Sequence, residues 1–398
     1  SLCLSVGSLP SLSHKLRSCR GLDLTVFANE SAQGYMFRSK RSNFVKRLWK
    51  LNVLTEDETK GSVETQADIE WKSIIHSVLK RLSEKQLEIL IESVESKGGE
   101  TTDCVLLPKG TIKLGRRGSV EPHIMCCQIW RWPQVDHNHK LKVLPWCHSC
   151  SQETHVCCNP YHWSLLMEPE SPPPPYSKEQ PTPTLQTDTP QQGSWQDHER
   201  VDNSRELLLR CQHCTGESGV SSSQHREGSY WCNVAYWELR QRVGRLFTVV
   251  QPTVSIFQDL PRGDGMCLKI LQEHADKDSV RRTRDKIGFG VVLFREPDCV
   301  WMYNRSSYPV FVNSPTLTAP NSRTLTVHKV SPGYSVRLFD FNRAVLLENS
   351  RDSLLFEDGP FDPNAVRISF AKGWGPCYSR QFITSCPCWL EVLLKAKR

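Results

Sequence analysis

Residues 157–162 read Cys-Cys-Asn-Pro-Tyr-His and place two thiols and an imidazole in one short segment. Two further cysteines, Cys104 and Cys147, lie upstream in the same region. Three thiolates and one imidazole are the donor set of a closed tetrahedral zinc site, in which no position remains for a catalytic water. The sequence therefore predicts one structural Zn²⁺ ion, held by Cys104, Cys147, Cys157 and His162.

The crowding of thiols in this region leaves alternatives open. Seven cysteines lie within residues 104–162, so Cys150 or Cys158 could replace one of the expected ligands. Cysteines also occur in protein cores as small hydrophobic side chains, without any metal. The choice among these thiols depends on the tertiary structure.

Upstream of the zinc motif, the apolar pattern predicts two helices. In residues 71–82 apolar side chains recur every three or four positions, which is typical of one buried helix face. Ser83 and Gln86 have the spacing of a capping box for the second helix, and Gly98 ends it. With the short strands and loops that follow, they predict a zinc-stapled α+β domain over residues 66–168.

Composition changes sharply after this domain. Residues 169–228 are rich in proline, serine, threonine and glutamine, and cannot bury enough apolar surface to offset their chain entropy. We therefore expect a disordered linker. A proline run that ends in tyrosine favours polyproline II structure and docking into a WW-type groove, although a stiff spacer is the alternative. This run consists of Pro172, Pro173, Pro174, Pro175 and Tyr176.

Residues 229–398 contain short alternating runs separated by proline, glycine, asparagine and aspartate, which predict a β-sandwich with flanking helices. A helical segment is expected at about residues 276–286. The expected strands are 231–237, 243–249, 291–294, 300–303, 310–312, 325–330, 335–339 and 366–370.

Two groups of cations stand out in this second domain. The helical segment carries Arg281, Arg282, Arg284 and Lys286, although a solvated helix face explains this group equally well. Lys372 and Arg380 flank a glycine-rich loop around Trp374, which we expect to be exposed. Such a loop suits the binding of a phosphorylated or acidic partner, but sequence alone does not bring the two groups together.

The N-terminal residues divide into two parts. Residues 1–35 precede the first methionine and lack the apolar core of a signal peptide, so we expect a non-native or disordered leader. Residues 36–65 begin with cations interleaved with apolar side chains and continue as a polar stretch. We expect a basic arm and linker, suited to nuclear import or to an acidic surface, with a frayed terminus as the alternative.

Composition limits the class of protein. The 38% of hydrophobic residues and the twelve tryptophans exclude a wholly disordered chain, and 50 basic against 43 acidic residues leave a net charge of +7. No window approaches the roughly 18 apolar residues of a membrane span. Seventeen unevenly clustered cysteines without a signal peptide favour a reduced, intracellular protein. The sequence contains no nucleotide-binding loop, nucleophile elbow or catalytic zinc motif, so no motif in it indicates an enzyme.

These motifs together resemble the Smad family, and within it the inhibitory, BMP-antagonising branch. Residues 131–133 and 157–162 are similar to the Mad-homology 1 (MH1) domain, whereas residues 303–305, 359–376 and 386–391 are similar to the Mad-homology 2 (MH2) domain. The resemblance covers nearly all of the chain from Met36. It implies two domains, and zinc on the four residues named above.

The resemblance also implies partners. Inhibitory Smads use residues matching Arg282, Lys286, Lys372 and Arg380 to bind activated type I BMP/TGF-β receptors, and we add Trp374 to this expected set. The proline run resembles a docking site for WW-domain HECT ubiquitin ligases. Receptor-regulated or common Smads are further expected partners. Nucleus and cytoplasm are the expected locations, without membrane insertion.

Two departures from the signal-transducing Smads matter. Those proteins end in a phosphorylated Ser-x-Ser tail, whereas the last serine here is Ser385, so we expect receptor binding without release of an activated messenger. Residues 108–123 match the hairpin that reads DNA bases, and Lys113, Arg116 and Arg117 could contact phosphates. The base-reading pattern is not recognisable, which predicts weak, salt-sensitive DNA binding.

The sequence thus predicts an inhibitory adaptor, and a zinc-containing, DNA-binding transcriptional repressor is the alternative. A long linker would let the two domains act independently.

Overall fold

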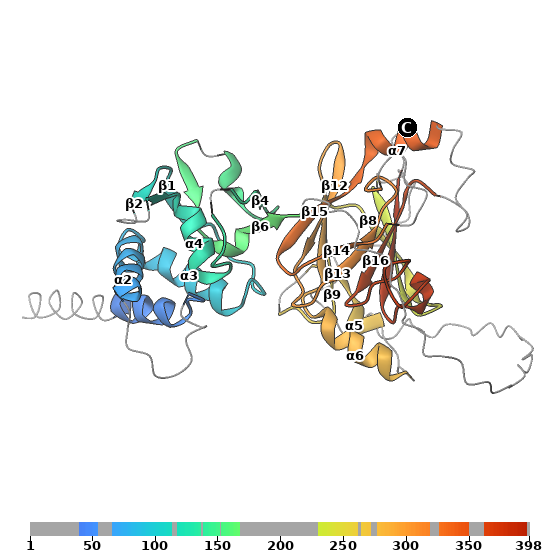
Figure 1. The fold of residues 1–398 in the computed structure, drawn as a ribbon, viewed down its shortest axis with the longest axis horizontal. Helices are drawn as coiled ribbons and strands as arrows, with labels where there is room; N and C mark the ends of the chain where they lie inside the picture. Colours follow the sequence, from blue (N-terminus) through green and yellow to red (C-terminus); the bar gives the residue numbers. More distant parts are fainter. Residues whose placement is uncertain are drawn as a thin grey trace, which may run out of the picture.

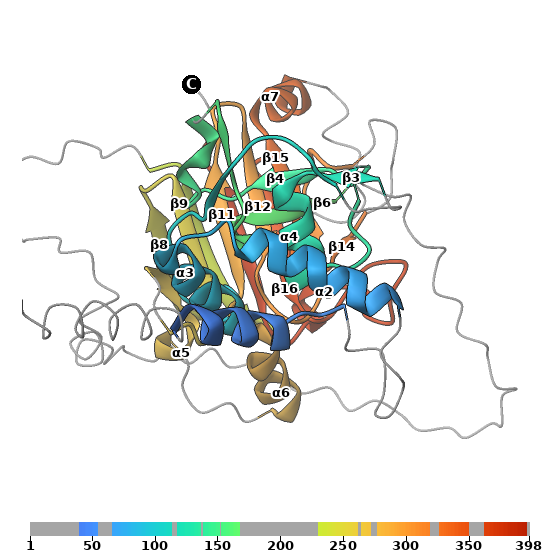
Figure 2. The same cartoon turned by 90° about the vertical axis from the view of Figure 1, so that its left-hand side faces the viewer.

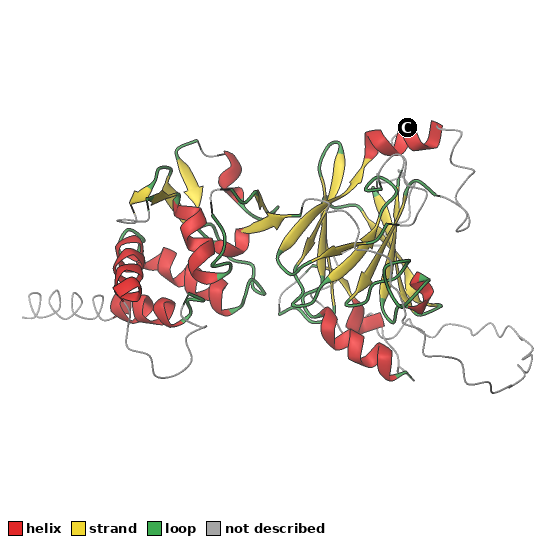
Figure 3. Ribbon diagram, in the orientation of Figure 1, coloured by secondary structure: helices red, strands yellow, loops and turns green. Residues whose placement is uncertain are grey.

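The computed structural model describes residues 40–54, 66–113, 118–136, 138–151, 153–167, 230–261, 264–271, 277–318, 326–349 and 362–395. They form two domains that lie side by side, a smaller helix-rich one and a larger sheet-rich one (Figures 1 and 3). The expected leader, the proline run 172–176 and Arg116 and Arg117 lie outside the described residues.

Helices build most of the N-terminal domain. They are residues 40–50, α2 (Gln66–Leu79), α3 (Glu84–Glu95), α4 (Pro122–Trp130) and the 3₁₀ turns η2 (His148–Ser151) and η3 (Pro160–His162). The capping box forms as predicted: the Gln86 amide donates to Ser83 Oγ at 3.2 Å, and the Ser83 amide donates to Gln86 Oε1 at 2.9 Å. The predicted apolar face of α2 is buried, because Ile75, Val78 and Leu79 are 0% exposed.

The basic segment upstream of α2 belongs to this same core. Leu48 of helix 40–50 is 0% exposed, and its carbonyl accepts a hydrogen bond from Trp130 Nε1 at 3.1 Å. The Val53 amide donates to the Ile129 carbonyl at 2.8 Å. The globular unit therefore begins upstream of residue 66, because the apolar face of this helix covers α4.

Three pairs of short strands complete the N-terminal domain, and all three are antiparallel. The pairs are β1 (Leu106–Pro108) with β5 (His155–Cys157), β2 (Ile112–Lys113) with β3 (Ser119–Val120), and β4 (Leu141–Val143) with β6 (Trp163–Leu166). Figure 2 views this domain from its helical side, with α2, α3 and α4 in front of the sheets of the second domain.

The C-terminal domain is a sandwich of two sheets, which confirms the predicted fold class. One sheet has the strand order β14-β13-β16-β17-β7-β8, and the other contains β10-β9-β11-β12-β15. Large side chains such as Tyr236, Phe339 and Phe370, none of them more than 1% exposed, belong to its core.

The strands are β7 (Cys232–Glu238), β8 (Gln241–Val249), β9 (Thr253–Phe257), β10 (Gly265–Cys267), β11 (Val291–Arg295), β12 (Cys299–Asn304), β13 (Val310–Asn313), β14 (His328–Val330), β15 (Tyr334–Asp340), β16 (Ala365–Phe370) and β17 (Trp389–Leu394). Helices α5 (Leu268–Leu271), α6 (Asp278–Ile287) and α7 (Phe341–Asn349) and the 3₁₀ turn η6 (Ile383–Ser385) flank the sheets.

The sequence pattern missed three of these strands. β9 and β10 are short and pair parallel with each other, and β17 lies between β16 and β7 in the middle of its sheet. In β17 the core-facing Leu390, Val392 and Leu394 alternate with positions that include the apolar Trp389 and Leu393, so the sequence lacks the polar–apolar alternation that identifies a half-buried strand. The predicted helical segment is confirmed as α6.

The second sheet continues into the N-terminal domain. β15 pairs parallel with β6, with Tyr334 opposite Leu165 and Ser335 opposite Leu166, and β4 lies beyond β6. Figure 1 shows β4 and β6 at the junction of the two domains, next to β15. The expectation of independent domains was therefore wrong for this structure, because periodicity does not reveal which strand covers a sheet edge.

Candidate zinc centre and basic surface

The four predicted zinc ligands converge in the N-terminal domain. Cys104 lies in the loop before β1, Cys147 precedes η2, Cys157 ends β5, and His162 ends η3. Their donor atoms all lie within 4.8 Å of one another, and three of the four residues are buried. The β1–β5 pairing brings the first and third ligands together although 53 positions separate them in the sequence.

The separations of these atoms suit one tetrahedral zinc ion. Cys104 Sγ is 3.7 Å from Cys147 Sγ, and both Cys104 Sγ and Cys157 Sγ are 3.5 Å from His162 Nδ1. Bonds of about 2.3 Å to sulfur and about 2.0–2.1 Å to nitrogen give tetrahedral edges of about 3.8 Å between sulfurs and about 3.6 Å between sulfur and nitrogen. The donor set and its geometry therefore fit Zn²⁺.

Hydrogen bonds outside the cluster orient its members. His162 Nε2 lies 3.1 Å from the Thr102 carbonyl, so this nitrogen carries the proton and Nδ1 faces the thiols. The Asn159 amide donates to Cys157 Sγ at 3.4 Å, and Ser149 Oγ lies 3.0 Å from Cys147 Sγ. These contacts set the histidine tautomer and hold two sulfurs in place.

Thiols packed so closely compete for protons. Hydrogen bonding with Cys104 and then Cys157 lowers the pKa of the Cys147 thiol, whereas Cys104 and Cys147 raise the pKa of Cys157. A divalent cation removes this competition because it binds thiolates. The alternative ligand Cys158 lies instead in the helical core beside Cys126, and the side chain of Cys150 lies outside the described residues.

The structure brings the predicted cations of the C-terminal domain together. Lys372 has a lowered pKa, first because of partial burial and then because of the positive charges of Lys286, Arg380 and Arg282. α6 and the 371–386 loop thus present one patch, which we call the basic surface: Arg282, Lys286, Lys372 and Arg380. A partly exposed group of like charges suits an anionic partner.

The remaining arginines of α6 have other partners. Arg284 forms two hydrogen bonds of 2.7 Å with the Glu238 carboxylate, and the two side chains are only 13% and 12% exposed. Arg281 pairs with Asp278 on the exposed side of the helix. The helix therefore uses Arg284 to attach itself to β7 and directs Arg282 and Lys286 toward the loop.

The position of Trp374 contradicts the expectation that this side chain is exposed. Trp374 is 1% exposed and packs with Phe311, Ile383 and Trp389, so its side chain anchors the loop and does not offer a contact surface. Glycines flank it because the chain is crowded there: a Cβ atom on Gly373 would lie 2.5 Å from the Tyr378 ring. The mistake arose because glycine-rich sequence usually indicates exposure.

The loop is closed by its own hydrogen bonds. The Gly375 amide donates to the Arg380 carbonyl at 2.7 Å, and Ser369 Oγ donates to the Lys372 carbonyl at 2.7 Å. Ala371 has a φ of +57°, which is unfavourable for a residue with a Cβ atom. These contacts hold Lys372 and Arg380 on the same loop at the same surface.

Other predicted features are partly described. Lys113 is exposed on the β2–β3 hairpin that matches the DNA-reading region, and Arg81 and Lys109 line a cleft of about 380 Å³ beside Ile112. Among the described parts of the chain, no helix combines the length and apolar character needed to cross a bilayer.

Comparisons with known proteins agree with this architecture. Two family models match: the MH1 domain over residues 71–167 and the MH2 domain over residues 229–395. The chain is 50% identical over 341 residues to "Mothers against decapentaplegic homolog 6" of Gallus gallus, covering 83% of this chain and 76% of that protein. It is 44% identical over 350 residues to homolog 7 of Mus musculus, covering 83% and 80%. The interferon regulatory factor 9 IAD domain aligns over 44% of this chain and 87% of that one at 12% identity, with a TM-score of 0.30, too low to support an inference.

Proposed function

The chain belongs to the inhibitory Smads of BMP/TGF-β signalling, and from this membership we propose that it is an adaptor whose MH2 domain captures activated type I receptors. Smad proteins are signalling adaptors and transcription factors rather than enzymes. The basic surface is the observation that carries the proposal. It gathers four cations from two separate elements, and partial burial together with the charges of the other three lowers the pKa of Lys372.

The expected partner surface is phosphorylated or acidic. Lysine and arginine bind phosphate oxygens through charge-assisted hydrogen bonds, and several of them on a rigid scaffold supply both affinity and orientation. The Arg284–Glu238 pair and the buried Trp374 make this scaffold rigid. The buried Trp374 side chain therefore supports the loop, whereas the four cations contact the partner protein. Partner Smads, which also carry acidic phosphorylated segments, are the second proposed ligand of this surface.

We propose that two further functions, zinc binding and ligase recruitment, belong to MH1 and to the linker respectively. MH1 is proposed to hold one structural Zn²⁺ ion through Cys104, Cys147, Cys157 and His162, which stabilises its fold and leaves no coordination position for catalysis. The linker is proposed to recruit a WW-domain HECT ubiquitin ligase through Tyr176 and the prolines before it. Nuclear and cytoplasmic residence is part of the same proposal.

The test is calorimetric titration of the full chain with a phosphorylated type I receptor kinase domain. Lys372→Glu should weaken binding at least about tenfold, since it both removes a cation and places a like charge opposite the partner's anions. Lys329→Glu is the matched control, because Lys329 is exposed on β14 and is not one of the four cations. Equal affinity of the wild type and Lys372→Glu would remove the basic surface from receptor capture.

The ligase arm is tested separately. Tyr176→Ala should abolish binding of a WW-domain fragment and leave the receptor titration unchanged, because the motif lies in the linker and not on MH2. Retained WW-domain binding would contradict the docking role.

A second function, DNA binding by MH1, is favoured by the β2–β3 hairpin and its neighbouring cations Arg81 and Lys109. Phosphate contacts alone give affinity that falls steeply with salt and does not distinguish sequences. Titration of a specific and a scrambled duplex at two salt concentrations decides the point: a clear preference for the specific duplex would favour the repressor hypothesis.

A further inference from the structure

The two domains meet along a strand pair that crosses between them. The Leu165 amide donates to the Gly333 carbonyl at 3.1 Å, and the Met167 amide donates to the Ser335 carbonyl at 2.9 Å. Ser335 Oγ also donates to Ser164 Oγ at 2.7 Å, and both serines are 0% exposed. The β6–β15 ladder is therefore a short, buried joint between MH1 and MH2.

In the described part of the chain, Arg131, Arg305 and Lys142 reach across this joint. Arg131 Nη2 donates to the Tyr303 hydroxyl at 2.9 Å, and Arg305 donates to the carbonyls of Gly98 and Gly99. Lys142 of β4 reaches the β11–β12 hairpin. Among the residues that the structure describes, only Lys142 of these three forms an ion pair with a carboxylate, that of Glu296.

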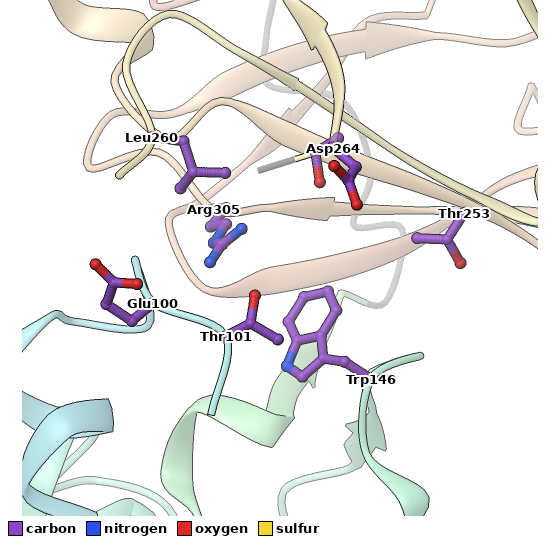
Figure 4. Close-up of a pocket in the computed structure, with 8 residues that line it drawn as sticks. Glu100, Thr101, Trp146, Thr253, Leu260, Asp264 and Arg305 are labelled. Atoms are coloured by element: carbon purple, nitrogen blue, oxygen red, sulfur yellow. The ribbon is translucent and has the colours of Figure 1, made fainter. Parts of the chain in front are cut away.

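The cleft beside Arg305 does not by itself indicate a ligand. It has a volume of about 260 Å³ and lies between MH1 residues such as Thr101 and Trp146 and MH2 residues such as Asp264 (Figure 4). Arg305 is already bound to two carbonyls and lies over the Trp146 ring at 5.6 Å. The cleft is a gap in the interface, whereas the surroundings of Lys142 are more specific.

The groups around Lys142 form a socket for an ammonium ion. Its Nζ atom lies 2.6 Å from Glu296 Oε1, 4.1 Å from the centre of the Trp301 ring and 5.7 Å from the centre of the Phe294 ring. A carboxylate and two aromatic faces are the groups that stabilise a partly desolvated ammonium. The Lys142 side chain is 18% exposed and that of Glu296 is 41% exposed, so the ion pair is partly shielded from water.

One hairpin of MH2 supplies the whole socket and orients it. Phe294 and Trp301 are opposite each other in the β11–β12 pairing, and Glu296 lies in the turn between them. Trp301 Nε1 donates to Glu296 Oε2 at 2.8 Å, which holds the carboxylate so that its other oxygen meets Lys142. Although burial opposes it, hydrogen bonds from Lys142 and Trp301 lower the pKa of Glu296 and keep it ionised.

We propose that Phe294, Glu296 and Trp301 form a lysine-binding socket of MH2, that Lys142 of MH1 is its ligand, and that neutralising this ammonium separates the domains at the β6–β15 ladder. Lysine acetylation is such a modification: the deprotonated Nζ attacks an acetyl thioester, an amide N–C bond forms as the C–S bond breaks, and the thiol and a proton are released. The product has neither the charge nor the cation–π contact. Because Lys142 is mostly covered in the closed form, acetylation would take place on the open form and keep it open.

The experiment measures amide hydrogen exchange at Leu165 and Met167, whose hydrogen bonds cross the joint. In the full chain, acetyllysine at position 142, Lys142→Gln and Lys142→Met should each speed this exchange at least about tenfold, the loss expected for a desolvated cation–π pair. Lys142→Met matters most because it keeps the length of the aliphatic stem without the charge. Glu296→Gln should have the same effect from the MH2 side. Lys329→Gln, on exposed β14, should leave the rate unchanged.

Amides in the β17–β7 ladder, which lies wholly within MH2, serve as the internal reference and should not change. If the amides of Leu165 and Met167 exchange at the wild-type rate in the Lys142→Met variant, the proposal is wrong. Packing of the aliphatic stem would then be enough to hold the domains together. Wild-type exchange in Glu296→Gln would overturn the proposal equally, since the carboxylate would not be needed.

Discussion

The candidate zinc centre of MH1 and the basic surface of MH2 assemble charged groups in opposite ways. The zinc ligands come from four separate segments, and most of them are buried, so their donor atoms compete for protons unless a cation binds them. The residues of the basic surface come from α6 and one loop. Packing of the buried Trp374 positions the loop, and the Arg284–Glu238 ion pair positions α6. A buried cluster of this kind depends on a bound ion for its stability, whereas a partly exposed cluster depends on the packing that supports it.

The largest expected effect is on the zinc centre. Cys157→Ser should abolish zinc binding and unfold MH1, because zinc contributes about 10–16 kcal/mol in small zinc domains. Metal content and thermal unfolding, with MH2 amides as the reference, provide the measurement. Cys158→Ser is the matched control, since this adjacent thiol lies in the helical core: it should keep one zinc ion and cost about 1–3 kcal/mol. Loss of zinc from the Cys158 variant alone would show that the ligand is misassigned.

The scaffold of the basic surface is tested at Arg284. Arg284→Met leaves the mostly buried Glu238 without its cation, so the free energy of MH2 unfolding should fall by about 3 kcal/mol in urea denaturation. Arg282→Met, two residues away on the same helix, should change stability by less than about 0.5 kcal/mol while weakening receptor binding. Equal stability of the two variants would mean that the patch does not depend on this ion pair.

Acid should weaken both regions for different reasons. At the zinc centre, protons compete directly with the metal for its ligands. In MH2, burial lowers the pKa of His328, which is 7% exposed, below its ordinary value of 6.5. Below pH 6.5 the unfolded chain therefore takes up a proton that the folded chain resists, so stability falls with falling pH, by at most about 1.4 kcal/mol per pH unit. His328→Val should flatten this slope in urea denaturation of MH2 between pH 7 and 5, and an unchanged slope would exclude this histidine.

The smallest expected effect concerns the backbone of the loop. Ala371→Gly should stabilise MH2 by about 0.5–1 kcal/mol, because a φ of +57° costs a residue with a Cβ atom more than it costs glycine. The same change at Ala344, buried within α7, should instead destabilise by about 1 kcal/mol or more. Chemical denaturation of both variants gives the sign, and destabilisation by Ala371→Gly would mean that the loop carries no backbone strain.

Local spacing in the sequence was enough to predict much of this protein. The zinc ligands, the Ser83 capping box, the α6 helix and most strands of the sandwich follow from residue type and short-range periodicity. The capping box, α6 and the strands depend on spacing within one segment, whereas the candidate zinc ligands were recognisable by residue type although they come from four segments. The candidate zinc ligands are an instructive case: their residue types pointed to them, but only the fold shows that Cys158 lies in the helical core.

Tertiary structure decided what lies between distant segments. Trp374 is buried, Arg284 meets Glu238 across 46 positions, and β6 covers the edge of β15. Lys142 finds Glu296 across 154 positions. Periodicity reports which face of a segment is apolar, but not which partner covers that face, because long-range pairing depends on chain closure and on the shapes of two surfaces at once. The sequence by itself therefore determined the fold classes of the two domains and a candidate set of metal ligands. The folded structure alone determined how the cations gather and how MH1 and MH2 join.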